Sequence, residues 1–139
     1  MPLFLNTKKL NYWLPKLISK AEKELVIIVP YIQTSERIFE ALKIANSNQV
    51  EIILIYRENK LPIKEKEKLL SLNNINLLHH PNIHCKCYYN GEILILSSMN
   101  LYDYSEKNNR EMGILACNEF FNEDSNKYNF EYYEEDSEE

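Results

Sequence analysis

The sequence predicts a single α/β domain in which helices flank a mixed β-sheet. In the first half, short apolar runs rich in β-branched residues alternate with amphipathic segments, a pattern typical of parallel strands joined by helices. In the second half, Asn90-Gly91 separates two apolar runs and predicts an antiparallel hairpin. The length of 139 residues also fits one domain.

An edge strand and a helix are expected first. Residues 3–5 are apolar and could form a short edge strand. Apolar residues then recur at steps of three and four, which indicates one face of a helix. Pro15 falls inside this helix, so the helix either kinks there or begins later. The expected buried face consists of Leu10, Trp13, Leu14, Leu17, Ile18 and Ala21.

Two buried strands and two further helices follow. Residues 25–30 and 50–56 are short, apolar and β-branched, as buried strands are. Between them, Thr34 or Ser35 can cap a second helix. A short, highly charged helix is expected over residues 64–72, with alternating charges that favour a solvated face. The buried face of the second helix is expected to contain Ile38, Phe39, Leu42 and Ala45.

The remaining elements are closely spaced strands. Residues 75–78 are one candidate, and residues 83–89 and 92–96 are the two arms of the hairpin. A polar stretch, residues 102–109, separates them from a last strand over residues 112–117. Antiparallel strands are therefore added to the parallel sheet of the first half.

The charge is distributed unevenly. Residues 1–118 hold 15 bases and 12 acids, whereas residues 119–139 hold nine acids and one base. We therefore expect a mildly basic domain over residues 1–118 and a solvated, flexible acidic tail over residues 119–139. An alternative is a tail that folds over a basic cleft and competes there with a polyanion.

Several classes of protein are excluded or made less favourable. Neither a GxxxxGK[ST] nor a GxGxxG motif occurs, which sets aside P-loop NTPases and dinucleotide-binding enzymes.

Three cysteines, an odd count, favour reduced thiols, and we expect them to be small buried hydrophobic residues. The longest apolar runs are too short to span a bilayer, and the N-terminus lacks the apolar core of a signal peptide. A cytoplasmic protein without a membrane span is expected.

A chemical site is indicated on the strand over residues 83–89. Side chains alternate along a strand, so His84, Lys86 and Tyr88 would share one face. Lysine is rarely buried without a partner, and an anion lying on this face would provide one. The hairpin would return Ser98 and Asn100, which can donate hydrogen bonds, to the level of His84.

These residues resemble the motif of the phospholipase D superfamily. The stretches that carry the resemblance are HCK, SSMN and NNREMGIL, which lie between His84 and Leu115. The superfamily's pattern is HxK, four residues, Asp, a short apolar strand, [GS]SxN and a later Glu. The preceding strand–helix units also look like those of the superfamily, so the resemblance extends to about residue 118. The single HxK is similar to that of Nuc-like endonucleases, and it implies the same fold.

The resemblance implies a role for each matching residue. His84 corresponds to the nucleophile that forms a phosphohistidine, and Lys86 and Asn100 correspond to the groups that bind the non-bridging phosphate oxygens. Ser98 corresponds to a supporting hydroxyl, and Glu111 to the acid that orients His84. No metal or other cofactor is implied. A second histidine must serve as acid, so a single-motif chain implies a homodimer with a composite site.

Two departures from the pattern stand out. Gly91 occupies the place of the superfamily's Asp, between Asn90 and Glu92. The hairpin is also one residue shorter than usual, whereas Ser97 stands where glycine is more common but where the pattern allows serine. The expected function is a metal-independent phosphodiesterase, with a nuclease acting on DNA or RNA favoured. A phospholipid-acting enzyme and a non-catalytic nucleic-acid-binding member are the alternatives.

Other interpretations of the same residues remain open. His84 and Lys86 could be a satisfied core histidine and a lysine whose stem alone is buried. Zinc could bind among five nearby side chains, although their spacing matches no known closed site. Tyrosines near the site could stack on bases, although ordinary packing is favoured. The residues concerned are His79, His80, His84, Cys85 and Cys87 for zinc, and Tyr88, Tyr102 and Tyr104 for stacking.

Overall fold

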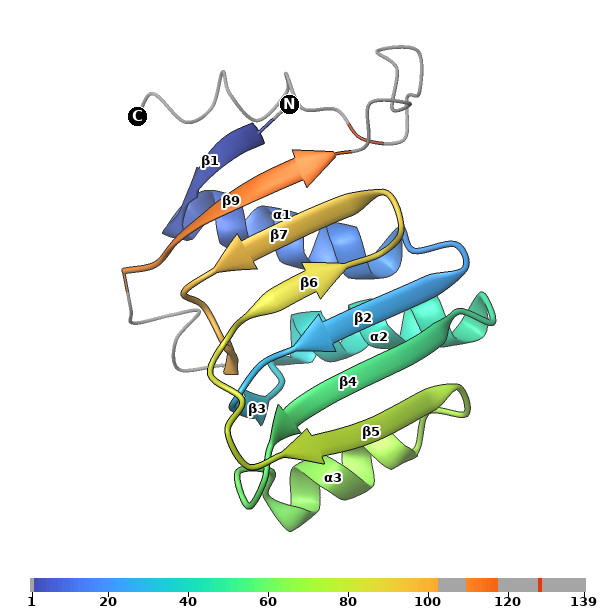
Figure 1. Ribbon diagram of the computed structural model, residues 1–139. Coiled ribbons are helices and arrows are strands. Elements are labelled where there is room, and N and C mark those ends of the chain that lie inside the picture. Colours follow the sequence, from blue (N-terminus) through green and yellow to red (C-terminus); the bar gives the residue numbers. More distant parts are fainter. Residues whose placement is uncertain (1, 103–109, 118–127, 129–139) are drawn as a thin grey trace.

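The computed structural model describes residues 2–102, 110–117 and 128, and these residues form three helices and nine strands (Figure 1). The helices are α1 (Thr7–Ser19), α2 (Glu36–Ser47) and α3 (Ile63–Leu70). The strands are β1 (Pro2–Asn6), β2 (Glu24–Ile28), β3 (Ile32–Gln33), β4 (Glu51–Arg57), β5 (Ile75–His80), β6 (Cys87–Tyr89), β7 (Ile93–Ser97), β8 (Leu101–Tyr102) and β9 (Met112–Cys117).

Seven strands form one mixed sheet in the order β1-β9-β7-β6-β2-β4-β5. β2, β4 and β5 are parallel to one another, whereas β6, β7, β9 and β1 each pair antiparallel with their neighbour. β3 and β8 form a separate parallel pair of two residues each. The mixed sheet of a single α/β domain is confirmed, and β1 is the edge strand that the sequence predicts.

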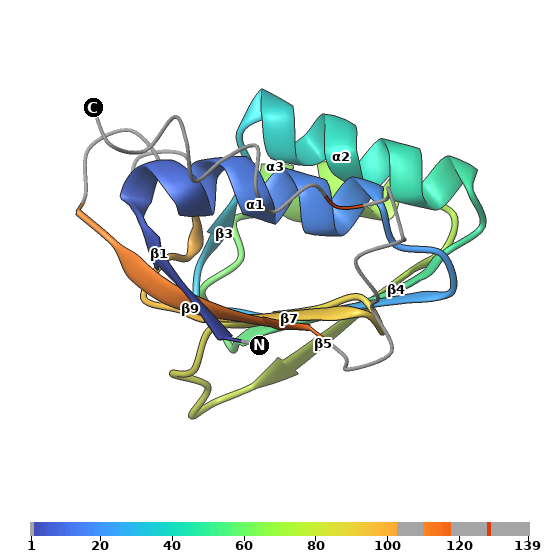
Figure 2. The same ribbon diagram turned by 90° about the horizontal axis from the view of Figure 1, so that it is seen from above.

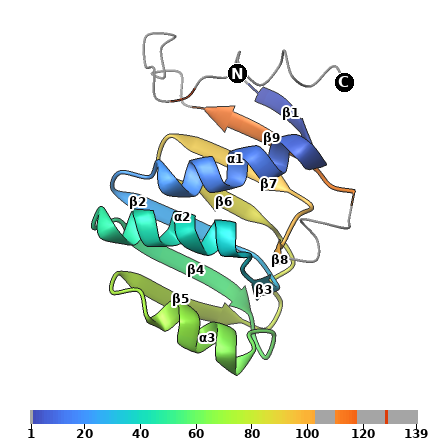
Figure 3. The same ribbon diagram turned by 180° about the vertical axis from the view of Figure 1, so that it is seen from behind.

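All three helices lie on one face of the sheet (Figures 2 and 3). The connections from β2 to β4 and from β4 to β5 step in the same direction, so their right-handed crossovers place α2 and α3 on the same side. Side chains of β2 and β4 alternate accordingly. Leu25, Ile27, Ile52 and Leu54 are fully buried beneath the helices, and the residues between them are only half-buried.

α1 begins at Thr7 and passes through Pro15. The Asn6 side chain caps it by accepting a hydrogen bond from the Lys9 amide, at 2.9 Å. A later start at Pro15 is therefore wrong. Proline removes one helical hydrogen bond, but the buried face holds the helix in place. That face contains Leu10, Trp13, Leu14, Leu17 and Ile18, as predicted.

α2 and α3 are joined by a buried polar contact that the sequence did not predict. Ser35 caps α2 by accepting from the Ile38 amide, at 3.2 Å. Thr34 instead donates its amide and its hydroxyl to Glu65 of α3, at 3.0 and 2.6 Å. Glu65 is only 7% exposed, and Lys68 donates to the Thr34 hydroxyl at 3.1 Å. The expectation of a merely solvated α3 is therefore wrong for this face.

The expected strand over residues 83–89 is shorter in the structure. β6 begins only at Cys87, and His84 is exposed in the segment that precedes it. The chain must first cross from β5, at one edge of the sheet, past β4 and β2 before it can pair. A single hydrogen bond from the Ser97 amide to the Lys86 carbonyl, at 3.3 Å, extends the contact between the two hairpin arms.

The acidic segment, residues 119–139, lies outside the described residues except for Tyr128. That side chain is 4% exposed, and its ring lies 6.3 Å from the ring of Trp13. Its hydroxyl accepts a hydrogen bond from Asn90 at 2.9 Å, at the turn between β6 and β7. Burial raises the pKa of the Tyr128 hydroxyl well above its usual range. In the described residues, no helix combines the length and apolarity needed to cross a membrane.

Candidate active site

The candidate residues meet where the ends of four central strands lie side by side, and the directions of these strands bring them there. This edge, formed by strand ends, is distinct from the edge strands β1 and β5. Cys87 pairs with Ile28, so the start of β6 lies beside the end of β2. Ser97 pairs with Gly113, so the end of β7 lies beside the start of β9. Residues that precede β6, follow β7 and precede β9 therefore meet at this edge. They are His84 and Lys86, Ser98 and Asn100, and Glu111.

His84 and Lys86 lie in the extended segment before β6. The imidazole is exposed, and the Lys86 ammonium group, on a half-buried side chain, lies 3.4 Å from the His84 carbonyl oxygen. Neither side chain forms an ion pair within the described residues. Both residues precede β6, so their expected place on a strand is wrong. An exposed imidazole, and an ammonium group that no carboxylate pairs with in the described part of the chain, are both open to an anionic ligand.

Ser98 and Glu111 are in direct contact. The Ser98 hydroxyl donates a hydrogen bond to the Glu111 carboxylate, and it accepts one from the Met112 amide at 3.1 Å. Between the described residues, no hydrogen bond joins Glu111 to His84, so the role of Glu111 as the orienting acid stays a prediction. Gly113 makes the close approach of β9 possible, because a Cβ there would lie 2.8 Å from the Leu96 carbonyl oxygen.

Asn100 is positioned by the small second sheet. β8 follows it directly and pairs with β3, which brings Asn100 alongside Tyr31. The Tyr31 amide donates to the Asn100 side-chain oxygen at 3.3 Å, which leaves the carboxamide NH₂ to point elsewhere. A pocket of about 420 Å³ adjoins Asn100 and is lined also by Tyr31 and Lys60. The two-residue strands that create this arrangement are too short for a periodic pattern to predict.

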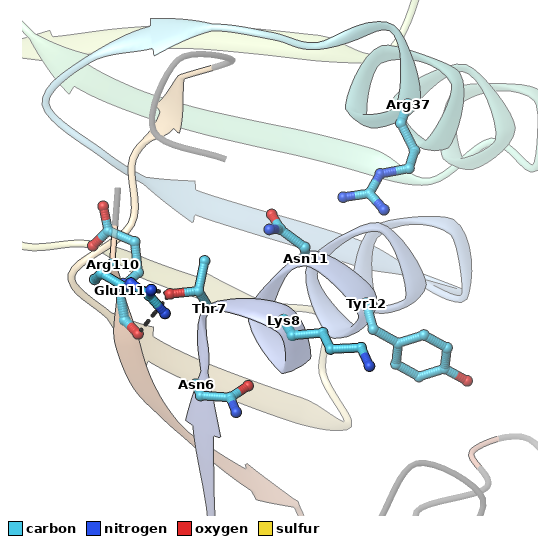
Figure 4. Close-up of a pocket in the computed structure, with 8 residues that line it drawn as sticks. All are labelled: Asn6, Thr7, Lys8, Asn11, Tyr12, Arg37, Arg110 and Glu111. Atoms are coloured by element: carbon cyan, nitrogen blue, oxygen red, sulfur yellow. Dashed lines mark hydrogen bonds between the residues drawn. The ribbon is translucent and has the colours of Figure 1, made fainter. Parts of the chain in front are cut away.

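A larger pocket of about 670 Å³ opens beside Glu111 (Figure 4). Thr7 anchors this side, because its hydroxyl accepts from the Glu111 amide at 2.6 Å and donates to the Glu111 carbonyl at 3.2 Å. Three cations, Lys8, Arg37 and Arg110, also line the pocket. Local sequence patterns do not indicate Thr7 or the three cations, because Thr7 and Glu111 are 104 positions apart.

Gly91, the departure from the expected motif, lies at the other end of the hairpin. It has φ 91°, a left-handed conformation that favours glycine in this turn. The Asn90 side chain accepts from the Glu92 and Ile93 amides, at 2.9 and 2.8 Å, and so completes the turn. β6 separates Gly91 from His84, so the missing carboxylate removes no group from the edge where the other residues meet.

The histidines and cysteines outside this cluster have different surroundings. His79 lies 4.0 Å from Glu58, and His80 accepts from the Asn82 amide at 3.0 Å, both on the edge strand β5. Cys85 is exposed, so its expected burial is wrong, whereas Cys87 and Cys117 are half-buried. Burial, and then the nearby Cys85, raises the pKa of the Cys87 thiol. The part of the chain that the structure describes contains no group of three potential metal ligands.

Tyr88 is a core residue. Its side chain is fully buried, and its hydroxyl donates to the Met99 carbonyl at 2.5 Å. This contact ties β6 to the segment between Ser98 and Asn100. The packing interpretation of Tyr88 is thus confirmed. The side chains of Tyr102 and Tyr104, which could also have stacked on bases, lie outside what the structure describes.

Comparisons with known proteins agree with this architecture. Residues 14–132 match a family model described as cardiolipin synthase, PLD-like domain. Nuc from Salmonella typhimurium, a phospholipase D family member, is similar with a TM-score of 0.70 at 18% identity, over 85% of this chain and 84% of that one. NucT from Helicobacter pylori is similar with a TM-score of 0.72 at 19% identity, over 83% and 84%.

A lipid-synthesising relative shares the fold as well. Phosphatidylserine synthase from Haemophilus influenzae gives a TM-score of 0.67 at 18% identity, and the match covers 84% of this chain but 34% of the synthase. The search of curated proteins found no match. At these identities the structural likenesses show the fold, and the match to the family model shows the family.

Proposed function

This chain belongs to the phospholipase D-like domain family, and from that premise we propose that it is a metal-independent phosphodiesterase that cleaves nucleic acids. One observation carries the proposal: the segments bearing His84, Lys86, Ser98, Asn100 and Glu111 meet at a single sheet edge although they span 28 positions of the sequence. Their residue types supply a nucleophile, a cation and neutral hydrogen-bond donors for one phosphodiester.

In the proposed reaction, an imidazole nitrogen of His84 attacks phosphorus. An N–P bond forms, and the bond from phosphorus to the leaving oxygen breaks. The leaving oxygen takes a proton from a second imidazole. That imidazole then removes a proton from water, and the water oxygen displaces His84 from phosphorus. Lys86 and the Asn100 carboxamide offset the charge on the non-bridging oxygens, and their preorganisation stabilises the transition state.

The second imidazole is proposed to be His84 of the partner subunit in a homodimer. His79 and His80 are engaged on β5, which β4 and β2 separate from β6. Within the described part of the chain, no hydrogen bond joins His79 or His80 to His84. A mixed dimer would lack one of the two imidazoles. When wild-type chains are coexpressed with an excess of tagged His84→Ala chains, the activity should fall well below the fraction of chains that are wild type. Activity proportional to the wild-type share would contradict the composite site.

The nuclease activity can be tested directly. We expect the wild-type protein to cleave single-stranded or duplex DNA or RNA in the presence of EDTA, and the His84→Ala protein to be inactive. His80→Ala is the matched control, since it removes an exposed imidazole that is not part of the proposed site. Absence of cleavage on the whole substrate panel, or equal cleavage by His84→Ala, would overturn the proposal.

A phospholipid is the second candidate substrate. It is supported by the description of the matching family model, which names cardiolipin synthase, and by the likeness to phosphatidylserine synthase. Phosphatidylglycerol and cardiolipin vesicles in the same EDTA buffer form the comparison arm. Turnover of vesicles without cleavage of nucleic acid would assign the site to lipids. Binding of nucleic acid without any product would make this chain a non-catalytic member.

A further inference from the structure

A groove leaves the candidate active site along the two helices α1 and α2. The pocket of about 670 Å³ begins at Glu111 and ends between the two helices, lined by Asn11, Tyr12 and Arg37. A second pocket of about 350 Å³ is lined by the same three residues and continues as far as Ser19, the last residue of α1. Together the two pockets form one groove that starts at the reactive edge.

Positive charge predominates in this groove. Four cations line it, and each is exposed or half-buried. Within the described residues, none of the four forms an ion pair with a carboxylate. Figure 4 shows three of them around the larger pocket: Lys8 on α1, Arg37 on α2, and Arg110 next to Glu111. The four cations are Lys8, Lys16, Arg37 and Arg110.

The two acids of the groove are already engaged. Glu40 lies 2.6 Å from the ammonium group of Lys43, and Glu111 accepts the hydroxyl of Ser98. The pair that Glu40 forms with Lys43 carries no net charge, so among the described lining residues the single negative charge of Glu111 stands against the four cations. An unneutralised row of cations beside a phosphodiester site is the electrostatic pattern of a polyanion track.

The first turn of α1 adds an independent observation. Lys8 and Lys9 stand there, and the turn contains no acid. The positive end of the helix dipole disfavours cations at this position. Sequence features that oppose local stability tend to mark functional sites. A bound anion would offset the unfavourable charge of Lys8 at the mouth of the groove.

We propose that this groove binds the sugar–phosphate backbone of the nucleic-acid strand that flanks the scissile phosphodiester. The proposal rests on the proposed nuclease function and adds where the strand next to the scissile bond lies. α1 has 13 residues and is about 20 Å long. Phosphates on one DNA strand advance by about 3.4 Å each along the duplex axis, so several can lie in the groove. A single phospholipid headgroup would leave most of the four cations unused.

Binding is tested first, in the inactive His84→Ala background. Fluorescence anisotropy of a labelled single-stranded DNA or RNA oligonucleotide is measured over a salt series. We expect the added substitutions Lys8→Gln and Arg37→Gln to weaken binding about tenfold near physiological salt, and to reduce the slope of log K against log salt by about 0.7 for each lost phosphate contact. The matched control is Lys64→Gln with Lys66→Gln, which removes two exposed charges from α3.

Two results would overturn the proposed role of the groove. One is no measurable binding by the His84→Ala protein, and the other is an equal slope of log K against log salt for the groove variant and the α3 control. Thermal melts of both variants confirm that each is folded. Because this arm needs no catalysis, it decides on the groove even if the nuclease activity fails.

Turnover provides the second test. For the wild-type protein, we expect kcat/KM to be higher for an oligonucleotide several nucleotides long than for a dinucleotide. The ratio of the two values should fall about tenfold in the Lys8→Gln, Arg37→Gln protein, because only the longer substrate reaches the groove. A ratio that stays at the wild-type value would overturn the proposal. Absence of turnover on every substrate would instead overturn the nuclease function and leave the binding result to decide on the groove.

Discussion

The Ser98 hydroxyl donates a hydrogen bond to the Glu111 carboxylate and so connects the end of β7 to the start of β9. The two residues are 13 positions apart, and the intervening residues 103–109 lie outside the described structure. The same hydroxyl accepts from the Met112 amide. Ser98 is therefore well placed to hold Glu111 at the edge where the other candidate residues meet.

Replacing this hydroxyl should reduce activity more than stability. Ser98→Ala removes the donor to Glu111 and leaves the Met112 amide without its side-chain acceptor. Loss of one charge-assisted hydrogen bond predicts a fall in kcat of about tenfold to a hundredfold. Ser97→Ala is the control, because among the described residues the Ser97 hydroxyl accepts from the Met99 amide and has no contact with Glu111. Steady-state kinetics on one oligonucleotide compare the two. Equal losses for both serines would contradict a specific role for Ser98.

Asn100 allows a substitution that separates structure from chemistry. Asn100→Asp keeps the oxygen that accepts from the Tyr31 amide, but it replaces the donating NH₂ group by a second, negatively charged oxygen. We expect a near-normal melting temperature and a fall in kcat of about a hundredfold or more, since loss of one preorganised donor has this effect in other enzymes. A fully active Asn100→Asp protein would exclude Asn100 from phosphate binding.

The two glycines should differ in what they control. Gly113→Ala places a methyl group 2.8 Å from the Leu96 carbonyl oxygen, and such overpacking destabilises by about 1–3 kcal/mol. Because β9 would move away from β7, activity should fall as well.

Gly91→Asp restores the family's residue at φ 91°, and we expect the free energy of unfolding to fall by about 1 kcal/mol with no gain in kcat. Urea unfolding and kinetics check both, and a gain in activity for Gly91→Asp would contradict our placement of that turn.

The buried Tyr128 predicts a dependence of stability on alkaline pH. Burial raises the pKa of its hydroxyl, so the folded chain holds this proton more tightly than the unfolded chain, where the pKa is about 10. The contribution of the buried Tyr128 hydroxyl to the free energy of unfolding should be fully present below pH about 10 and should be lost as the pH rises further.

Tyr128→Phe removes the contact with Asn90 and should destabilise the fold by about 1 kcal/mol near neutral pH. The difference in unfolding free energy between wild type and Tyr128→Phe should then shrink above pH about 10. Urea titrations of both proteins over a pH series measure it. A constant difference up to strongly alkaline pH would contradict the burial of this hydroxyl in solution.

Local patterns predicted most of the fold. The apolar periodicity of α1, the β-branched runs of β2 and β4, and the Asn90-Gly91 turn each determine their element within a few residues. The position of His84 was predicted less well. Alternation placed its side chain in the sheet, but the crossing from β5 to β6 uses those residues before pairing begins.

Contacts between distant segments could not be predicted from local patterns. Thr7 meets Glu111 only because β1 pairs with β9 at the edge of the sheet. Arg37 joins the same pocket from another helix. The motif identified the candidate site residues, and the packing of α1 against α2 revealed the basic groove beside them.

The central claim, that His84 is the nucleophile, is tested most directly by trapping the intermediate. A labelled oligonucleotide is mixed with the wild-type protein in EDTA, the reaction is stopped in alkaline denaturant, and the digested protein is examined by mass spectrometry. We predict a phosphorus-linked adduct on the peptide that contains His84, and none on the His84→Ala protein. Cleavage in EDTA that continues at the wild-type rate in His84→Ala, with no adduct on the wild-type peptide, would contradict the account.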